Sequence, residues 1–367
     1  MIVHLNGRLL PLEDARISPF DRGFIFGDGV YEGLRSFGGR MRAMDRHIAR
    51  MRAGLAESRI QWDPSELTSM SLALIHANAM PDAFVYWQVT RGTPGPGQPV
   101  RSRVPAGPMT PTVFGYCSPV PPLEAFLGDP PTIRMATRPD LRWQRGHLKS
   151  ISLMGGVLSA LEAAEHAAAD ALLVRDGWLA EGTYANTIVG WSRNGREELA
   201  TPPLNKPSIL AGVTRSLELE SAPDVTVRPI HQEELAQASE IMLVGTTTMV
   251  TSVTHLDGVP VGDGRPGPMA RRLLASPLPG RARRCSSPPP PGRPGCSPVR
   301  WRAISAARSG EWQAGRTSAA RWSMTSGWRA RSTTRPGTCA SGWPRRAGST
   351  SISTMSAGRC STRCWST

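Results

Sequence analysis

The composition of this 367-residue chain changes abruptly after about Leu274, and this break limits where a packed core can form. Residues 276–367 contain 16 arginines, no lysine and a single acidic residue, Glu311, so their net charge is +15. Leu278 is the only leucine there, and Asp, Asn, Phe, Tyr and His do not occur. Too few aliphatic side chains remain to form a core, and we expect this tail to be disordered. The fold must therefore be encoded by residues 1–275.

Three explanations of the tail compete. Its arginines and tryptophans could bind RNA or single-stranded DNA through phosphate contacts and base stacking. It could also be a natural disordered extension. We favour a shifted reading frame of a GC-rich gene, because such a frame supplies mainly Arg, Pro, Ser, Gly, Ala, Trp and Cys codons. The other 275 residues have a net charge of −1, so a nucleic-acid-binding protein is only a distant alternative.

The sequence gives no indication of a membrane segment or a metal site. No apolar run approaches the roughly 18 residues that a spanning helix needs. The first residues, MIVHLNGRLL, lack the charged start and long apolar run of a signal peptide. We therefore expect a cytoplasmic protein. Five of the six cysteines lie in the tail, and the spacing in CSTRC is not that of a zinc site.

Local patterns predict a mixed α+β body. Residues 2–11 read as a hairpin with an Asn-Gly turn. Residues 46–60 have a helical apolar face, and residues 83–92 and 111–120 read as strands. The proline-rich segment that follows indicates a connection between domains. We predict a small α/β domain over residues 1–118 and a linker over 119–128.

A second, larger domain is predicted over residues 129–275. Residues 152–171 are expected to be helical, and residues 170–191 to form a hairpin with an Asp-Gly turn. Residues 208–220 show a glycine break followed by a helix. Residues 240–261 predict a strand, a threonine-rich loop, a second strand and another Asp-Gly turn.

Lys149 is conspicuous because the chain has only one other lysine, Lys206, against 41 arginines. Lysine, unlike arginine, can lose its proton when desolvated and then attack a carbonyl group. Lys149 is therefore a candidate for Schiff-base formation, although a lysine can also survive by chance, as we suppose for Lys206.

The motifs around Lys149 resemble those of the class IV aminotransferases, the fold-type IV pyridoxal-phosphate enzymes. The resemblance covers about residues 2–275 and depends on seven motifs that occur in the family's order. They are DRGFIFGDGVYEGLR (21–35), DRHIARM (45–51), VTRG (89–92), HLKS (147–150), LAEGTYANTI (179–188), LAGVTR (210–215) and GTTTMVTSV (245–253). The tail has no counterpart in the family.

The resemblance implies a catalytic role for Lys149 and a supporting role for Glu181. In the family, the matching lysine holds pyridoxal 5'-phosphate covalently and then moves the proton between the substrate Cα and C4′. Glu181 matches the acid that pairs with the pyridine nitrogen, and a carboxylate there keeps this nitrogen protonated, so that the ring can withdraw charge. Taken alone, Glu181 could equally be a solvated carboxylate in a turn.

The resemblance also implies a set of contacts to the cofactor phosphate. Val213 and Thr214 lie at a glycine break before a helix, where backbone N–H groups suit an anion. Thr246 matches a second hydroxyl contact, and Arg50 matches an arginine that reaches the same phosphate. Without the motif order, Arg50 would be an exposed helix charge and the threonines ordinary hydroxyls at strand ends.

The substrate side of the site resembles the D-amino-acid aminotransferases more than the other branches. Tyr31 matches a tyrosine that lines their pocket. An Arg-x-His pair traps the substrate carboxylate in those enzymes, and here the loop offers Arg101 and Arg103 instead. A solvated basic loop is the alternative. Met154 stands where branched-chain enzymes usually have a tyrosine, and Tyr184 interrupts a run that is often serine-rich.

We therefore expect ping-pong transfer of an amino group from an amino acid, with D-alanine favoured, to a 2-oxo acid. Branched-chain L-amino-acid aminotransferase and aminodeoxychorismate lyase are the alternatives within the family. The resemblance further implies a homodimer whose active site takes residues from both subunits, with pyridoxal 5'-phosphate as cofactor.

Overall fold

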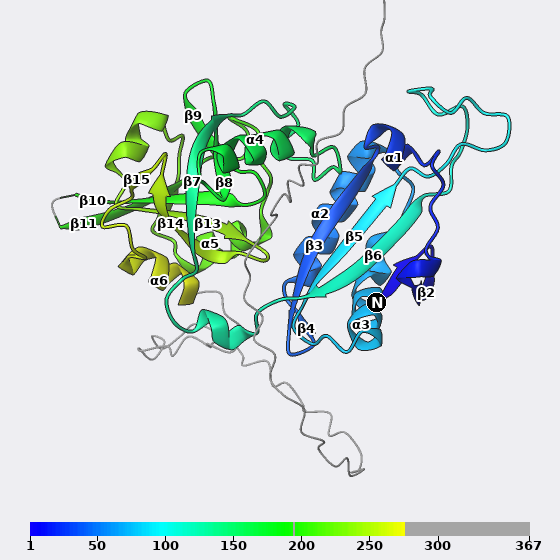
Figure 1. Ribbon diagram of the computed structural model, residues 1–367, viewed down its shortest axis with the longest axis horizontal. Coiled ribbons are helices and arrows are strands. Elements are labelled where there is room, and N and C mark those ends of the chain that lie inside the picture. Colours follow the sequence, from blue (N-terminus) through cyan, green and yellow to red (C-terminus); the bar gives the residue numbers. More distant parts are fainter. Residues whose placement is uncertain (194, 276–367) are drawn as a thin grey trace, which may run out of the picture. The chain divides into compact units, whose positions relative to one another are not determined.

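The computed structural model describes residues 1–193 and 195–275 of the chain. They form two β-sheets with helices packed against them, which confirms the predicted α+β class (Figure 1). The predicted tail lies outside the described residues. Within the described part, no helix is both long and apolar enough to cross a membrane.

The first sheet is antiparallel throughout and has the strand order β2-β1-β6-β5-β3-β4. The predicted hairpin turns at Asn6 and Gly7, whose φ angles are 49° and 84°, in the left-handed region that such a turn requires. The strands are β1 (Ile2–Leu5), β2 (Arg8–Pro11), β3 (Gly29–Phe37), β4 (Arg40–Met41), β5 (Ala83–Thr90) and β6 (Thr112–Pro119).

The two faces of this sheet follow the alternation of the sequence. In β5, Val85, Trp87 and Val89 are fully buried, whereas Tyr86 is only half-buried on the opposite face. Helices α2 (Met44–Ser58) and α3 (Leu67–Ala77) cover the buried face and complete its core (Figure 1). The opposite face carries the rings of Tyr31, Tyr86 and Tyr116 in successive contact.

The second sheet has nine strands in the order β12-β11-β10-β13-β14-β7-β8-β9, and β15 pairs with β14. It is mixed, because β7 runs parallel to both β14 and β8. Its strands are β7 (Thr132–Pro139), β8 (Asp170–Arg175), β9 (Trp178–Gly182), β10 (Asn186–Arg193), β11 (Arg196–Thr201), β12 (Val225–Val227), β13 (Glu240–Gly245), β14 (Met249–Leu256) and β15 (Val259–Pro260). The proposed division at residues 118 and 128 stays a prediction.

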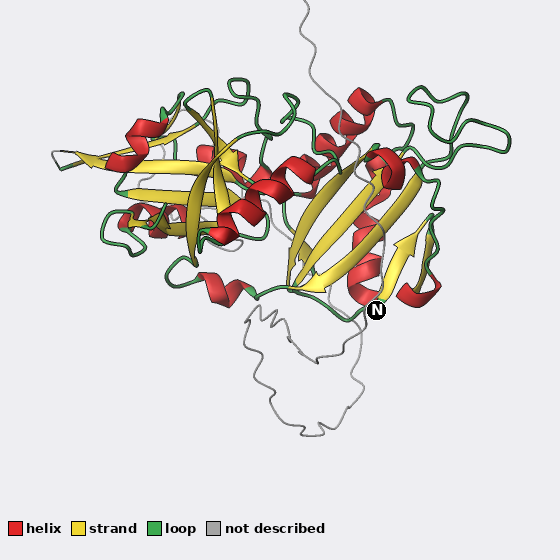
Figure 2. Cartoon of the chain, turned by 45° about the horizontal axis from the view of Figure 1, so that its top comes forward, coloured by secondary structure: helices red, strands yellow, loops and turns green. Residues whose placement is uncertain are grey.

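The remaining helices divide between the two sheets, and three of the four remaining α-helices pack on the second (Figure 1 and Figure 2). The α-helices are α1 (Arg22–Phe26), α4 (Met154–Glu165), α5 (Val213–Ser221) and α6 (Pro268–Ala275). The short 3-10 helices are η1 (Leu12–Asp14), η2 (Pro64–Glu66), η3 (Leu123–Phe126) and η4 (Gln232–Gln237).

The helix predicted over residues 152–171 is shorter than expected. It begins at Met154 and ends at Glu165, and Ala167 then turns the chain with a φ of 56°. The following residues form β8, whose side chains are almost entirely buried. Burial in the sheet therefore outweighs the helical propensity of the alanine-rich sequence.

One core cluster beneath α5 and α6 contains an unexpected acid. Glu218 of α5 is 0% exposed, and neither of its carboxylate oxygens has a hydrogen-bond partner. Burial raises the pKa of Glu218 from its ordinary value of 4.5 to about 8, although the nearby Arg42 opposes the shift. The acid is therefore neutral below this pH.

We predict that the substitution Glu218→Leu stabilises the protein more at pH 9 than at pH 5. A folded-state pKa above the unfolded value stabilises the wild type at low pH, and this stabilisation is lost as the pH rises toward 8. The gain in unfolding free energy for the leucine variant should therefore grow by roughly 2–5 kcal/mol across this range. Urea unfolding at both pH values measures it, and an equal gain at both would contradict the buried acid.

Candidate active site

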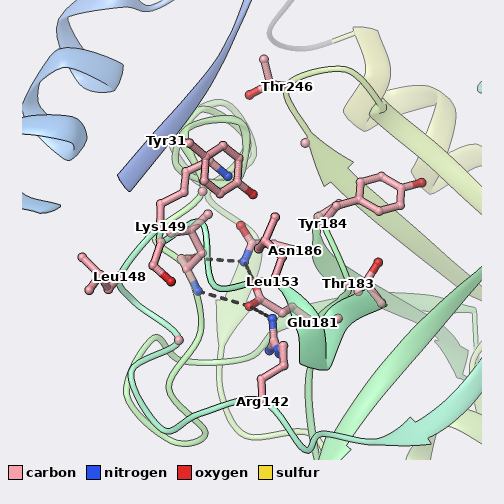
Figure 3. A pocket seen from close by; sticks show the side chains of 18 of the residues that line it. Tyr31, Arg142, Leu148, Lys149, Leu153, Glu181, Thr183, Tyr184, Asn186 and Thr246 are labelled. Atoms are coloured by element: carbon pink, nitrogen blue, oxygen red, sulfur yellow. Dashed lines mark hydrogen bonds and ion pairs between the residues drawn. The ribbon is translucent and has the colours of Figure 1, made fainter. Parts of the chain in front are cut away.

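The two sheets contribute to one pocket, drawn in Figure 3. It is lined by the end of β9, by the segment between β7 and α4, by the loop before α5, and by residues of β3 and α2. The structure brings together seven of the nine predicted site residues in this pocket. These are Tyr31, Arg50, Lys149, Glu181, Val213, Thr214 and Thr246.

Lys149 is positioned by backbone pairing with the first sheet. Its carbonyl oxygen accepts a hydrogen bond of 3.0 Å from the N–H of Tyr31, and Ile151 donates to Gly29 at 3.1 Å. The segment thereby adds a short bridge to β3. The Lys149 Nζ lies 4.2 Å from the centre of the Tyr31 ring, so the only lysine of the pocket faces an aromatic surface (Figure 3).

Glu181 lies at the end of β9 and is only 4% exposed. Its Oε1 accepts from Arg142 Nη1 at 2.9 Å and from the backbone N–H of Leu210 at 3.4 Å. Its Oε2 accepts from Asn186 Nδ2 at 2.9 Å. Burial raises the pKa of Glu181, and the charge of Arg142 opposes this shift. We assign the ionised form to this carboxylate, because three donors are directed at its oxygens.

A chain of ion pairs continues from Glu181 away from the pocket. Arg142 also donates to Asp140 through Nε at 2.8 Å, and Asp140 lies 3.0 Å from Arg175 Nη2. Arg142 therefore binds two carboxylates, which raises its pKa and fixes its charge. Its guanidinium orients Glu181 and is not available to bind a ligand.

The opposite end of the pocket offers donors for an anion. Gly212 precedes α5, and the first-turn N–H groups of Val213 and Thr214 have no acceptors within the helix. A side chain at Gly212 would collide with the Asn186 side chain, so glycine keeps this approach open. The hydroxyl residue Thr246 lines the pocket from the turn between β13 and β14.

Arg50 reaches this end from α2 and is held by a buried acid. Its Nε and Nη2 donate to both oxygens of Glu32, at 2.7 and 2.8 Å, and its Nη1 donates to the Ala211 carbonyl at 3.0 Å. His47 lies 2.8 Å from the same carboxylate. Although burial opposes it, Arg50 and His47 hold the pKa of Glu32 down to about 2. Glu32 therefore stays ionised and compensates the charge of Arg50.

Arg101 and Arg103 do not line this pocket of the same chain. Both are exposed in the loop between β5 and β6. The Arg101 guanidinium lies 5.7 Å from the Phe26 ring, and the Arg103 carbonyl accepts from Arg22 at 3.0 Å. Tyr184, singled out in the sequence, does line the pocket but is 52% exposed, and its ring extends away from Lys149 in Figure 3.

Several residues that shape the site were not predicted from the sequence. Arg142, Asn186 and Leu210 bind Glu181, and Glu32 binds Arg50. Three of them, Glu32, Asn186 and Leu210, lie within the quoted motifs, but no local pattern marks them as polar partners. In residues 1–193 and 195–275, no group of three His, Cys, Asp or Glu side chains is placed to hold a metal ion.

Comparison with known proteins shows the family of the chain. The family model for amino-transferase class IV matches residues 29–256. The D-alanine aminotransferase of Bacillus licheniformis is 34% identical over 281 residues, which cover 74% of this chain and 94% of that protein. That of Listeria monocytogenes strain F2365 is 31% identical over 282 residues, or 74% of this chain and 93% of the relative.

Similar solved structures include the branched-chain amino acid aminotransferase of Escherichia coli. It is 21% identical, has a TM-score of 0.64, and is matched over 74% of this chain and 91% of that one. A hypothetical aminotransferase from Mycobacterium tuberculosis, in a form bound to pyridoxal phosphate, has a TM-score of 0.62 at 21% identity and covers 76% and 99% of the two chains. These likenesses confirm the fold. The chain belongs to the class IV aminotransferase family, and it is a pyridoxal-phosphate-dependent aminotransferase of fold type IV.

Proposed function

We propose that this enzyme transfers the amino group of a D-amino acid, with D-alanine favoured, to a 2-oxo acid. The observation that carries the proposal is the 34% identity to a D-alanine aminotransferase over nearly the whole length of that protein. The branched-chain enzymes resemble the chain in fold at 21–25% identity, and this likeness does not assign a substrate.

The donor set of the pocket fits pyridoxal phosphate. The buried carboxylate of Glu181 is stabilised by a protonated nitrogen, and the N–H groups at the start of α5 can bind an anion. Lys149 lines the same pocket. When bound, the cofactor supplies an electron-withdrawing ring that stabilises negative charge at the substrate α carbon. We assign its phosphate to Val213, Thr214, Thr246 and Arg50.

Lys149 has the catalytic role in this proposal. It would hold the cofactor, and its Nζ would accept the proton from the substrate α carbon. Tyr31 presents its ring to the ammonium and restricts its position. The carboxylate of Glu181, oriented by Arg142 and Asn186, would keep the pyridine nitrogen of the cofactor protonated.

The substrate carboxylate needs a cation that this copy of the pocket does not offer. Among its described lining residues, Arg50 is paired with Glu32 and Arg142 with Glu181, and we assign Lys149 to the cofactor. We propose that the enzyme is a homodimer in which the loop of one copy brings Arg101 and Arg103 to the pocket of the other.

An apolar face on α4 supports this assembly. Val157, Leu158 and Leu161 are 50%, 51% and 57% exposed, and Met154 before them is 69% exposed. These residues recur at helical spacing on an element beside the pocket. Such a contiguous face is typical of a subunit contact.

The substrate assignment is tested by assaying D-alanine, L-leucine and aminodeoxychorismate with the same preparation, using 2-oxoglutarate as acceptor for the two amino acids. We expect pyruvate from D-alanine at a kcat/KM at least about 100-fold above that for L-leucine, a difference of roughly 2.7 kcal/mol in transition-state binding. Reaction with L-leucine alone would assign the branched-chain branch. Release of pyruvate from aminodeoxychorismate alone would assign the lyase branch.

The dimer is tested by Leu158→Glu, which places a charge in the apolar face of α4. We expect wild type at twice the chain mass by light scattering, and the variant as a monomer with a large loss of transaminase activity. Glu165→Lys, an exposed charge change at the end of the same helix, is the control and should remain dimeric. A monomeric wild type, or a dimeric Leu158→Glu, would rule out this interface.

A further inference from the structure

A second partly buried arginine lies behind the anion-binding end of the pocket. Arg42 follows β4, and its Nη1 is 3.5 Å from Thr214 Oγ1 and 3.5 Å from Met249 Sδ. Its Nη2 is buried without a hydrogen-bond partner. Arg42 does not line the pocket, but it contacts Thr214, which does.

The charges around this end make Arg42 important. The guanidinium of Arg50 is paired with Glu32 at both oxygens, so its charge is largely compensated. Arg35 donates to the carbonyls of Thr247 and Pro121, and it has the Phe37 ring on one side. Arg42 is the arginine that contacts the Thr214 side chain, and the charge of the buried Glu218 acts on it without a hydrogen bond between the two.

Glu218 decides whether the charge of Arg42 is compensated. It is one helical turn after Thr214 in α5, fully buried, and has no hydrogen-bond partner. Arg42 is the charged group that acts on it. The other charged side chains of α5 point elsewhere, because Arg215 donates to Thr201 and Pro202, and Glu220 pairs with Arg46. β13, which packs on α5, contributes the apolar Met242 and Val244 to this core.

We propose that Arg42 is a positioning residue for the cofactor phosphate, and that protonation of Glu218 leaves its positive charge free to act. Arg42 donates to Thr214 Oγ1, which directs the threonine hydroxyl proton toward the anion. This inference rests on the proposed placement of the phosphate at the start of α5. Ionisation of Glu218, whose pKa burial raises to about 8, would act against the positive charge of Arg42.

The test measures the dissociation constant of pyridoxal phosphate by spectroscopic titration, with pyridoxal as the matched ligand that lacks the phosphate. At pH 7, Arg42→Met should raise the dissociation constant of pyridoxal phosphate about tenfold and leave that of pyridoxal unchanged. Arg42→Lys should restore part of the lost affinity for pyridoxal phosphate. Arg46→Met is the control, because Arg46 also contacts α5 but pairs with the exposed Glu220. This substitution should change the dissociation constant of neither ligand by more than about twofold.

The coupling to Glu218 is tested by comparing wild type with Glu218→Gln at each pH from 6 to 9. The two should bind alike near pH 6, and wild type should bind about tenfold more weakly than the variant at pH 9. This comparison cancels the titration of the cofactor itself. It also remains decisive if Arg42→Met does not fold, since glutamine keeps the shape of the buried acid.

Each outcome has a defined meaning. Equal losses for both ligands in Arg42→Met, or no loss, would overturn the positioning role. Identical pH profiles for wild type and Glu218→Gln would overturn the coupling. If wild type binds pyridoxal phosphate without dependence on Lys149, or with no preference over pyridoxal, the proposed site itself fails, and the result is then distinct from a failure of Arg42.

Discussion

The bidentate pairing of Arg50 with the buried Glu32 fixes one end of the pocket, and another arginine extends the same contact. Arg50 begins in α2 and Arg35 in the first sheet, and both donate to residues of the second half of the chain. Their acceptors are the Ala211 carbonyl and the Thr247 carbonyl. The loop before α5 and the turn after β13 are thereby held beside α2, so the anion-binding groups depend on this contact for their position.

The opposite end of the pocket uses the same principle with the charges reversed. There, Arg142 and Asn186 donate hydrogen bonds to the buried carboxylate of Glu181 and fix its orientation. One end of the pocket therefore contains Arg50, whose charge is compensated by Glu32, and the other contains the oriented carboxylate of Glu181. Lys149 lines the same pocket. A cofactor with a phosphate and a protonatable ring nitrogen satisfies both ends at once, which is why its chemistry can be assigned to residues from distant parts of the sequence.

Much of the fold could be predicted because local patterns encode it. The Asn-Gly hairpin and the alternating strand β5 follow from turn chemistry and period-two burial. The helix after Lys149 ends six residues before its predicted end, because the burial of β8 is a tertiary effect. Arg142 and Glu218 were missed for the same reason. Arg142 lies 39 residues from Glu181 in the sequence. Glu218 is fully buried, and its neighbours in the sequence do not predict this burial.

The central claim is that Lys149 binds the cofactor in the pocket that contains Glu181. The chain has only two lysines, Lys149 and Lys206, so covalent trapping gives an unambiguous answer. The protein would be incubated with one equivalent of pyridoxal phosphate, reduced with borohydride, digested and mapped by mass spectrometry. We expect a phosphopyridoxyl group on Lys149. Modification of Lys206 in its place, or of neither lysine, would contradict it.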